Sequence, residues 1–305
     1  MSSTEHPRQR PVLALGLRII SALLIATMFM LAKLAIESGV AVPEVMFWRL
    51  ALTVPLLLGY LALTSGLHRL RTKRVVSHGL RAGLGITGMM FNFAAVSLLP
   101  LAESTTLGFT APLFAVILTA AVLQQRVGLW RWIAVLFGFS GVLVIAQPGS
   151  VPIPVLGATC GLMAGLFNAI ISFQIRELGR TDEPISVVFW FSIFGGGAML
   201  MLMPFFMIAH TPYQLMILMA LGVTGTLGQL FMTAALRLGP VASVIVMDYT
   251  ALIWATGFGY LIWDQLPPMT TWFGAPLIVI AGLVIAWREH HLARNRAPVS
   301  AIEGD

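Results

Sequence analysis

Residues 85–100 read GITGMMFNFAAVSLLP, and residues 225–240 read GTLGQLFMTAALRLGP. Laid without a gap on residues 225–286, residues 85–146 are identical at 17 of 62 positions. Apolar composition raises chance identity, but it does not place prolines and tryptophans at one offset. The shared pairs include Gly85/Gly225, Gly88/Gly228, Phe91/Phe231, Pro100/Pro240, Thr110/Thr250, Gln125/Gln265 and Trp132/Trp272. Self-similarity at one period indicates a duplicated unit.

The whole chain is far more apolar than a soluble protein. Of its 305 residues, 58% are hydrophobic and only 10% are charged, against about a quarter charged in soluble domains. Crossing a bilayer takes a helix of about 20 apolar residues. Ten apolar runs have about this length: 12–35, 44–64, 79–98, 101–123, 129–146, 153–175, 185–209, 213–236, 241–263 and 271–288. We therefore expect an all-α integral membrane protein with ten transmembrane helices.

The basic residues predict which way the chain is threaded. Sixteen of the 18 Lys and Arg lie at one side of the membrane: they precede or begin the first run, end or follow the tenth, or lie in or beside the connections between runs 2 and 3, 4 and 5, 6 and 7, and 8 and 9. Lys and Arg accumulate on the cytoplasmic side of membrane proteins. We expect a multi-pass protein of the inner (cytoplasmic) membrane with both termini inside, including a cytoplasmic tail at residues 291–305.

The duplication and the span count together predict an inverted repeat. One copy would be the N-terminal five-helix unit of residues 1–147, and the other the C-terminal unit of residues 153–290. Because five is odd, the second unit enters the membrane from the opposite side. Two inverted units present equivalent faces to the two sides of the membrane. Alternating-access carriers use this arrangement, with the substrate near the midplane.

Lys33 and Arg49 are the two cations on the other side of the membrane. We favour the interpretation that both side chains extend to the outer interface. The alternative is that they form an outer gate or contact a substrate carboxylate.

Polar residues present in only one copy are the better candidates for a binding site, because duplicated positions preserve packing. Asp248 aligns with Gly108, Gln229 with Met89, and Asn92 with Met232. Asn168 and Gln229 are expected at a depth similar to that of Asp248, where the three could surround one ligand.

Asp248 is the candidate with the clearest physical cost. A carboxylate within a span costs about 2.5–3.5 kcal/mol on insertion scales, and such groups face the bundle interior or water. It would bind a substrate ammonium group or carry a proton. The alternative is a structural hydrogen bond to Ser243, Tyr249 or Thr250. Among the aromatic residues, Tyr249 and Trp190 are the candidates for stacking on a substrate, although most intramembrane aromatic residues only pack.

Several short motifs carry a resemblance to a known family. They are FWRLAL at 47–52, AAVSLLPLA at 94–102, TAPLF at 110–114, GFSGVLV at 138–144 and, in the second copy, AALRLGPVA at 234–242. In these motifs, over nearly its whole length, the chain resembles the drug/metabolite transporter superfamily in its EamA branch. It departs from the family where spans 4 and 9 end, with Gln124-Gln125 and Asp264-Gln265 in place of Gly-Glu.

The resemblance implies export of small metabolites, with aromatic and other neutral amino acids foremost. Another small metabolite, such as a vitamin, a nucleobase or a drug, is the alternative substrate. It also implies a central cavity lined by both halves, with spans 5 and 10 at the periphery. We add Thr110, from the TAPLF motif, to the cavity candidates. The expected partners are a small-molecule substrate and the lipid bilayer, without nucleic acid; a monomer and a homodimer are both open.

Other functional classes fit the sequence less well. An intramembrane enzyme needs a nucleophile with a base, or metal ligands, and the six histidines lie at run ends or in loops. We therefore expect no enzymatic activity, no cofactor and no metal. A channel would carry rings of charge or a repeated filter loop. A non-transporting membrane scaffold would account for the hydrophobicity but not for the inverted repeat.

Overall fold

A computed structural model describes residues 11–64, 66–122, 124–125, 127–146, 154–238 and 247–295, and within these ranges every regular element is a helix. In chain order the elements are α1 (Pro11–Glu37), α2 (Val42–Thr64), η1 (Leu67–Leu70), α3 (Val75–Leu98), α4 (Leu101–Gly108), α5 (Ala111–Ala121), α6 (Leu129–Ala146), α7 (Val155–Leu178), α8 (Pro184–Phe206), α9 (Pro212–Leu238), η2 (Met247–Tyr249), α11 (Thr250–Trp263) and α12 (Met269–Asn295). Pro240 and Ser243 lie outside the described residues.

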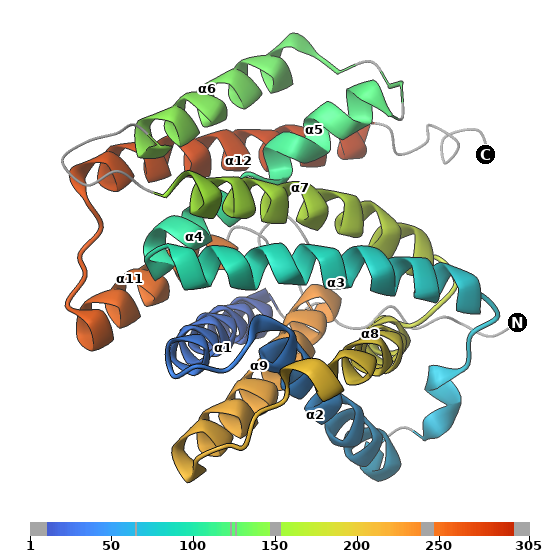
Figure 1. Ribbon diagram of the computed structural model, residues 1–305. Helices are drawn as coiled ribbons and strands as arrows, with labels where there is room; N and C mark the ends of the chain where they lie inside the picture. Colours follow the sequence, from blue (N-terminus) through green and yellow to red (C-terminus); the bar gives the residue numbers. More distant parts are fainter. Residues whose placement is uncertain are drawn as a thin grey trace, which may run out of the picture.

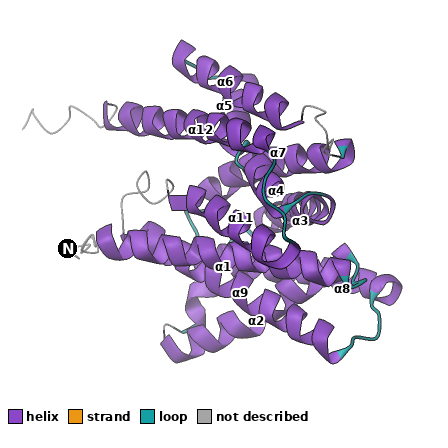
Figure 2. Ribbon diagram, turned by 90° about the vertical axis from the view of Figure 1, so that its left-hand side faces the viewer, coloured by secondary structure: helices purple, strands orange, loops and turns teal. Residues whose placement is uncertain are grey.

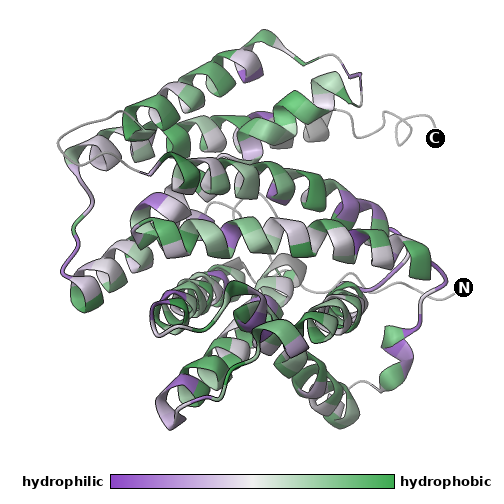
Figure 3. Ribbon diagram, in the orientation of Figure 1, coloured by the Kyte–Doolittle hydropathy of each residue, from purple (hydrophilic) through white to green (hydrophobic). Residues whose placement is uncertain are grey.

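Within the described residues, eight segments are helices long and apolar enough to cross a membrane, with α4 and α5 forming one of them. The expectation of a multi-pass helical membrane protein is confirmed, and Figure 3 shows hydrophobic residues along most of each helix. Two of the ten expected spans are not among the eight. In α3, Arg81, Asn92 and several glycines lower the hydropathy, and the described part of the ninth span, α11, is 14 residues long.

The helices pack in pairs that join the first half of the chain to the second. α1 packs on α9, α3 on α7, α2 on α8, α4 on α11 and α6 on α12. Figures 1 and 2 show α5, α6 and α12 together at one side of the bundle, α1, α2, α8 and α9 at the other, and α3 with α7 between them. The core of the bundle is therefore built from both halves.

Glycines repeated between the two copies allow close helix contacts. A Cβ atom added to Gly88 of α3 would lie 2.9 Å from Phe167 of α7, and one added to Gly228 of α9 would lie 2.9 Å from Ile25 of α1. Ser21 of α1 also donates a 2.7 Å hydrogen bond to the Gly228 carbonyl. Small residues let membrane helices approach closely, so these two glycines fix the α3–α7 and α1–α9 crossings.

The contact between α6 and α12 also reflects the duplication. A Cβ atom on Gly138 would lie 3.0 Å from Ala281, and one on Gly141 would lie 3.1 Å from Ile278. The offset of 140 interchanges these two contacts, because Gly138 aligns with Ile278 and Gly141 with Ala281.

The two ends of the bundle can be told apart by their contacts. At the end opposite to the basic loops, Lys33 donates to the carbonyl of Leu99, after α3, over 2.7 Å. At the same end Gln214, at the start of α9, donates to the carbonyl of Ser38 over 2.9 Å. Since α3 ends where α9 begins, these two helices run in opposite directions. We call this end the outer face and the end with the basic loops the basic face.

At the basic face, hydrogen bonds and ion pairs join the segment before α3 and the start of α3 to the connection between α7 and α8. Arg69 donates to Glu183 over 2.6 Å, and Thr72 donates to Asp182 over 2.7 Å. His78 Nε2 lies 2.7 Å from the same Asp182 carboxylate. Burial raises the pKa of Asp182, but the hydrogen bonds with Thr72 and His78, together with the positive charges of His78 and Arg74, hold the pKa below its ordinary value.

The helix ends at Gln124 and Asp264, which the alignment pairs, share one unusual conformation. Both residues have left-handed backbone, with φ of 50° and 52°. The following amides make matching hydrogen bonds, Gln125 to Thr119 and Gln265 to Gly259, each 3.1 Å long. Glycine is the residue that usually occupies such a left-handed position at a helix end.

Replacing Gln124 with Gly should stabilise the protein. A non-glycine residue in the left-handed region costs roughly 1–2 kcal/mol, which glycine would avoid. The greater conformational freedom of glycine in the unfolded chain offsets part of this stabilisation. We expect a net increase of about 0.5–1 kcal/mol in the free energy of unfolding, seen as a higher melting temperature in detergent. Gln125→Gly is the matched control and should not raise the melting temperature. Equal shifts in melting temperature for both variants would contradict the idea that the backbone at Gln124 is strained.

The Asp182 cluster should make stability depend on acid pH. A carboxylate with a lowered folded pKa stabilises the fold above its unfolded pKa of about 3.9, and the stabilisation is lost as the pH falls through the folded value. Asp182→Asn should cost about 1.5–3 kcal/mol at pH 7, because charged hydrogen bonds are lost. Its melting temperature should then fall less below about pH 4 than that of the wild type.

Glu177→Gln is the control for this cluster, because the Glu177 side chain is 54% exposed in its ion pair with Arg74. Exposed pairs contribute little, so this variant should follow the wild-type pH profile. An Asp182→Asn profile parallel to that of the wild type would show that the carboxylate does not carry the effect.

Candidate functional site

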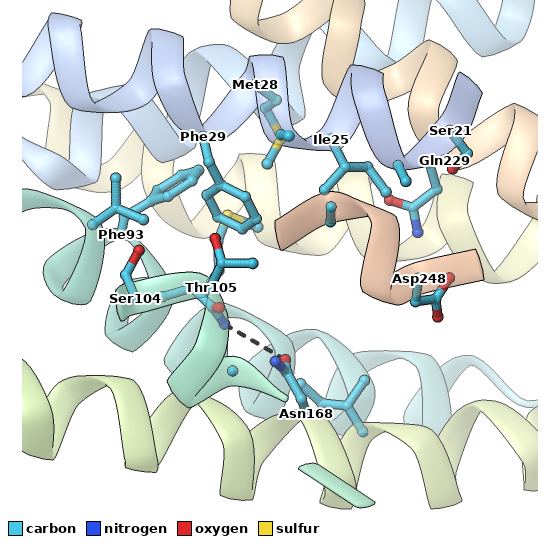
Figure 4. Close-up of a pocket in the computed structure, with 18 of the residues that line it drawn as sticks. Ser21, Ile25, Met28, Phe29, Phe93, Ser104, Thr105, Asn168, Gln229 and Asp248 are labelled. Atoms are coloured by element: carbon cyan, nitrogen blue, oxygen red, sulfur yellow. Dashed lines mark hydrogen bonds between the residues drawn. The ribbon is translucent and has the colours of Figure 1, made fainter. Parts of the chain in front are cut away.

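A cavity of about 360 Å³ lies inside the bundle, between helices of both halves. α1, α3 and α4 supply most of its wall from the first half, and α7, α8, α9, η2 and α11 supply the rest from the second half. Figure 4 shows Phe29 and Phe93 toward one end of it, with Gln229 and Asp248 toward the other. Neither α6 nor α12 contributes a lining residue.

An interrupted helix forms one part of the wall. α4 ends at Gly108 and α5 begins at Ala111, and Ser104, Thr105 and Phe109 around this break line the cavity. The paired segment of the second copy has a three-residue 3₁₀ turn, η2, before α11. Irregular backbone at membrane depth is tolerated where it is buried in protein or lines a cavity. The two breaks meet through Phe109 and Tyr249, whose ring centroids are 4.8 Å apart.

The three polar candidates found in only one copy and Asn168, which was expected at a similar depth, all line this cavity. Asp248 comes from η2, Gln229 from α9, Asn92 from α3 and Asn168 from α7. Asn92 donates to the Asn168 side chain over 3.5 Å, the contact drawn as a dashed line in Figure 4. Helices far apart in the sequence therefore bring these residues together, while their role in binding stays a prediction.

Asp248 forms an ion pair with Arg18 of α1. The partners expected from the sequence were Ser243, Tyr249 and Thr250, which lie in the same span as Asp248; Arg18 lies in a different helix. Arg18 is buried, at 8% exposure, and lies well inside α1. The contact joins the two halves of the chain and occupies the carboxylate that was expected to bind an ammonium group. A substrate ammonium would therefore have to share Asp248 with Arg18 or replace it.

The two cations assigned to the outer interface lie in different places. Lys33 is buried, at 6% exposure, and besides its bond to Leu99 it lies 5.5 Å from the Trp263 ring centroid. Arg49 instead lines the cavity, where its guanidinium donates to Gln229 over 3.3 Å. The interpretation that both side chains extend to the interface is thus wrong for Arg49, because α2 carries it into the bundle.

The remaining candidates lie outside the cavity wall. Thr110 is fully buried and donates to the carbonyl of Leu107 over 2.6 Å. Trp190 donates to the carbonyl of Leu70 over 2.9 Å, which places it near the basic face. Tyr249 reaches the site only through its contact with Phe109.

Sequence reasoning missed Arg18 and Arg81 as lining residues, because both were assigned to the cytoplasmic ends of their spans. Arg81 lines the cavity from α3 with Gly85 and Met89. The spacing of four residues between these three positions places them on one helical face. That spacing was the available signal, since it puts a cation on the same face as the repeated Gly85.

Comparison with known proteins gives a consistent picture of the family. The model of the EamA-like transporter family matches residues 12–147 and again residues 155–287. The two matched segments cover most of the chain, and the break between them falls between α6 and α7.

Several curated relatives are transporters named for different small molecules. The pseudopaline exporter CntI of Pseudomonas aeruginosa is 28% identical over 256 residues, covering 82% of this chain and 88% of its own. The riboflavin transporter of Vibrio cholerae is 26% identical over 307 residues, covering 97% and 99%. The S-adenosylmethionine uptake transporter of Rickettsia prowazekii is 25% identical over 252 residues, covering 81% and 83%.

A solved crystal structure matches the fold with a TM-score of 0.62, covering 95% of this chain and 99% of the other. At 20% identity, this likeness shows the fold alone.

Proposed function

This chain belongs to the EamA-like transporter family of the drug/metabolite transporter superfamily, and we propose that it is a secondary transporter that exports small metabolites by alternating access. The observation that carries the proposal is the central cavity, which helices of both halves enclose and which holds buried charge. Ionisable residues inside a membrane bundle mark substrate or ion pathways.

We propose that residues 1–147 and 153–290 form two inverted five-helix units. The opposite directions of the aligned helices α3 and α9 support this. The exchange of contacts between Gly138–Ala281 and Gly141–Ile278 supports it as well. In such carriers the halves rock about a fixed site near the midplane. Phe109 and Tyr249, which are aligned and in contact, would lie close to the axis between them.

The basic face is proposed to be cytoplasmic. It carries Arg69, Arg74 and Arg180, whereas among the described residues the outer connections at 38–41, 99–100 and 207–211 carry no Lys or Arg. Lys and Arg in short loops set the orientation of membrane proteins. Both termini would then lie in the cytoplasm and the protein would reside in the inner membrane.

Amino acids, including neutral and aromatic ones, are the proposed substrates. The relatives named above are transporters of small molecules, which supports a small-molecule substrate. Phe29 and Phe93 offer an apolar surface for a side chain, and Asp248 with the cavity arginines offers charges of both signs. The ammonium and carboxylate groups of an amino acid would each meet a group of opposite charge in this cavity.

Counterflow into proteoliposomes tests this function directly. Proteoliposomes that contain the purified protein are loaded with one unlabelled amino acid and should accumulate the same labelled amino acid from outside. A panel of amino acids, with and without a pH gradient, would identify the preferred substrate. Riboflavin belongs in the panel as the competing class of substrate. A protein that moves no solute from this panel or any other would not be a carrier.

Asp248→Asn tests whether the buried carboxylate takes part in transport. The change removes the charge that pairs with Arg18 but keeps the shape of the side chain. We expect a folded protein whose transport rate falls at least about tenfold or no longer varies with pH, since the lost charged contact is worth roughly 1.5–3 kcal/mol. Rates should be measured from pH 5 to 9.

Asp264→Asn is the matched control, because Asp264 lies at the end of α11, outside the cavity wall. Asparagine also tolerates left-handed backbone. This control should transport at the wild-type rate. Unchanged kinetics of Asp248→Asn at every pH would remove Asp248 from the mechanism.

A further inference from the structure

The charges in the cavity wall are not balanced. Arg18, Arg49 and Arg81 line it together with a single carboxylate, Asp248. Asp248 is paired with Arg18, and within the described ranges neither Arg49 nor Arg81 forms an ion pair. Arginine stays protonated in proteins, so two positive charges remain uncompensated.

Arg81 is the more isolated of the two. Its exposure is 6%, and its Nε and Nη1 atoms are buried without a hydrogen-bond partner among the described residues. The guanidinium lies over the Phe191 ring, 4.6 Å from the centroid. That contact attracts the charge but accepts no hydrogen bond. A buried guanidinium in this state lacks the acceptors that normally accompany such burial.

Among the described residues, Arg49 has only neutral acceptors. Its Nε lies 3.2 Å from the sulfur of Met28, and its Nη1 lies 3.6 Å from the sulfur of Met89. Thioether sulfur is a weak acceptor, and the amide of Gln229 is neutral. None of these partners carries the negative charge that would balance the guanidinium.

Space for both cations is left by two aligned glycines. A Cβ atom on Gly85 would meet Arg81 and Phe191, and one on Gly225 would meet Met28 and lie 3.6 Å from Arg49 Nε. Gly225 lies beside Arg49 of α2, and Gly85 lies beside Phe191 of α8. Arg49 and Phe191 are each seven residues after the first residue of their helix, so the two glycines face corresponding positions. The repeated pattern therefore places one guanidinium beside each of the two aligned glycines.

The two guanidinium groups lie close to each other along α3. Met89, which contacts Arg49, is eight residues from Arg81, or about 12 Å along the helix axis. The Arg81 side chain extends past Gly85 and so covers part of that length. One small ligand in the cavity can therefore reach both.

We propose that the substrate is an organic anion whose carboxylate groups bind Arg49 and Arg81, so that an acidic amino acid or a dicarboxylate is preferred over a neutral amino acid. The inference rests on the proposed transport function and specifies its substrate. Guanidinium and carboxylate match in planar, bidentate hydrogen bonds. A neutral zwitterion leaves the two extra charges unbalanced, whereas a dicarboxylate balances both.

Pairs of solutes that differ only in charge test the proposal. Glutamate is compared with glutamine, and succinate with succinamide, in two assays on the full-length protein. Binding is measured as the ligand-induced rise in melting temperature in detergent, and transport as inhibition of counterflow. The charged member should bind about 10- to 100-fold more tightly, as expected for charge-assisted hydrogen bonds. Equal effects of glutamate and glutamine, and of succinate and succinamide, would overturn the proposal.

Arg49→Gln and Arg81→Gln should each remove most of this preference. Arg81→Lys keeps the charge but loses the bidentate geometry, and it should fall between Arg81→Gln and the wild type. Arg176→Gln is the control, because Arg176 is exposed near the end of α7, away from the cavity. It should keep the wild-type preference.

Stability separates a ligand site from a structural role. Removing a buried cation that has no partner relieves a desolvation cost, so ligand-free Arg81→Gln should melt no lower than the wild type. A lower melting temperature with an unchanged preference for anions would show that Arg81 is structural and would overturn the proposal.

The two assays also separate this inference from the proposed function. Anion-selective stabilisation without transport of any solute would leave the binding site intact and refute the carrier. Counterflow of neutral amino acids that acidic ones do not inhibit would support the carrier and refute the anion site.

Discussion

The close approach of helices at Gly88 and Gly228 is the contact on which the rest of the bundle depends. These aligned glycines set the crossings of α3 with α7 and of α1 with α9. The same four helices carry Arg18, Asn92, Asn168 and Gln229 into one cavity. Without a hydrophobic drive between helices in lipid, packing of this kind holds the assembly together. A side chain at either glycine would therefore alter the cavity as well as the fold.

The buried charges follow from this packing. A cation inside a membrane is costly unless it is paired, and the bundle pairs only one of the three arginines in the cavity, through the Arg18–Asp248 contact between halves. Arg49 and Arg81 are left with a neutral amide, thioether sulfurs and an aromatic ring. A site that leaves cations unbalanced gains most from a ligand that supplies the missing negative charge.

The duplicated helix ends show how repetition and function differ. Gln124 and Asp264 keep the same left-handed backbone and the same hydrogen-bond pattern. Their side chains differ in charge, and neither lines the cavity. Asp248 and Gly108 are also aligned, yet only Asp248 brings charge to the site. Backbone geometry is thus shared by the two copies at these helix ends, while the carboxylate of Asp248 has no counterpart in the first copy.

The sequence by itself determined the membrane class, the apolar helices, the duplication and the polar residues Asn92, Asn168, Gln229 and Asp248. Each of these rests on local hydropathy or on an alignment of the chain with itself, and needs no knowledge of packing. Only the tertiary structure decided that Arg18, Arg49 and Arg81 face the cavity and that Trp190 and Thr110 do not. The positive-inside rule treats a cation near a helix end as exposed to water. In the folded bundle, the partners of that cation depend on which other helices pack against it, and local sequence does not give this.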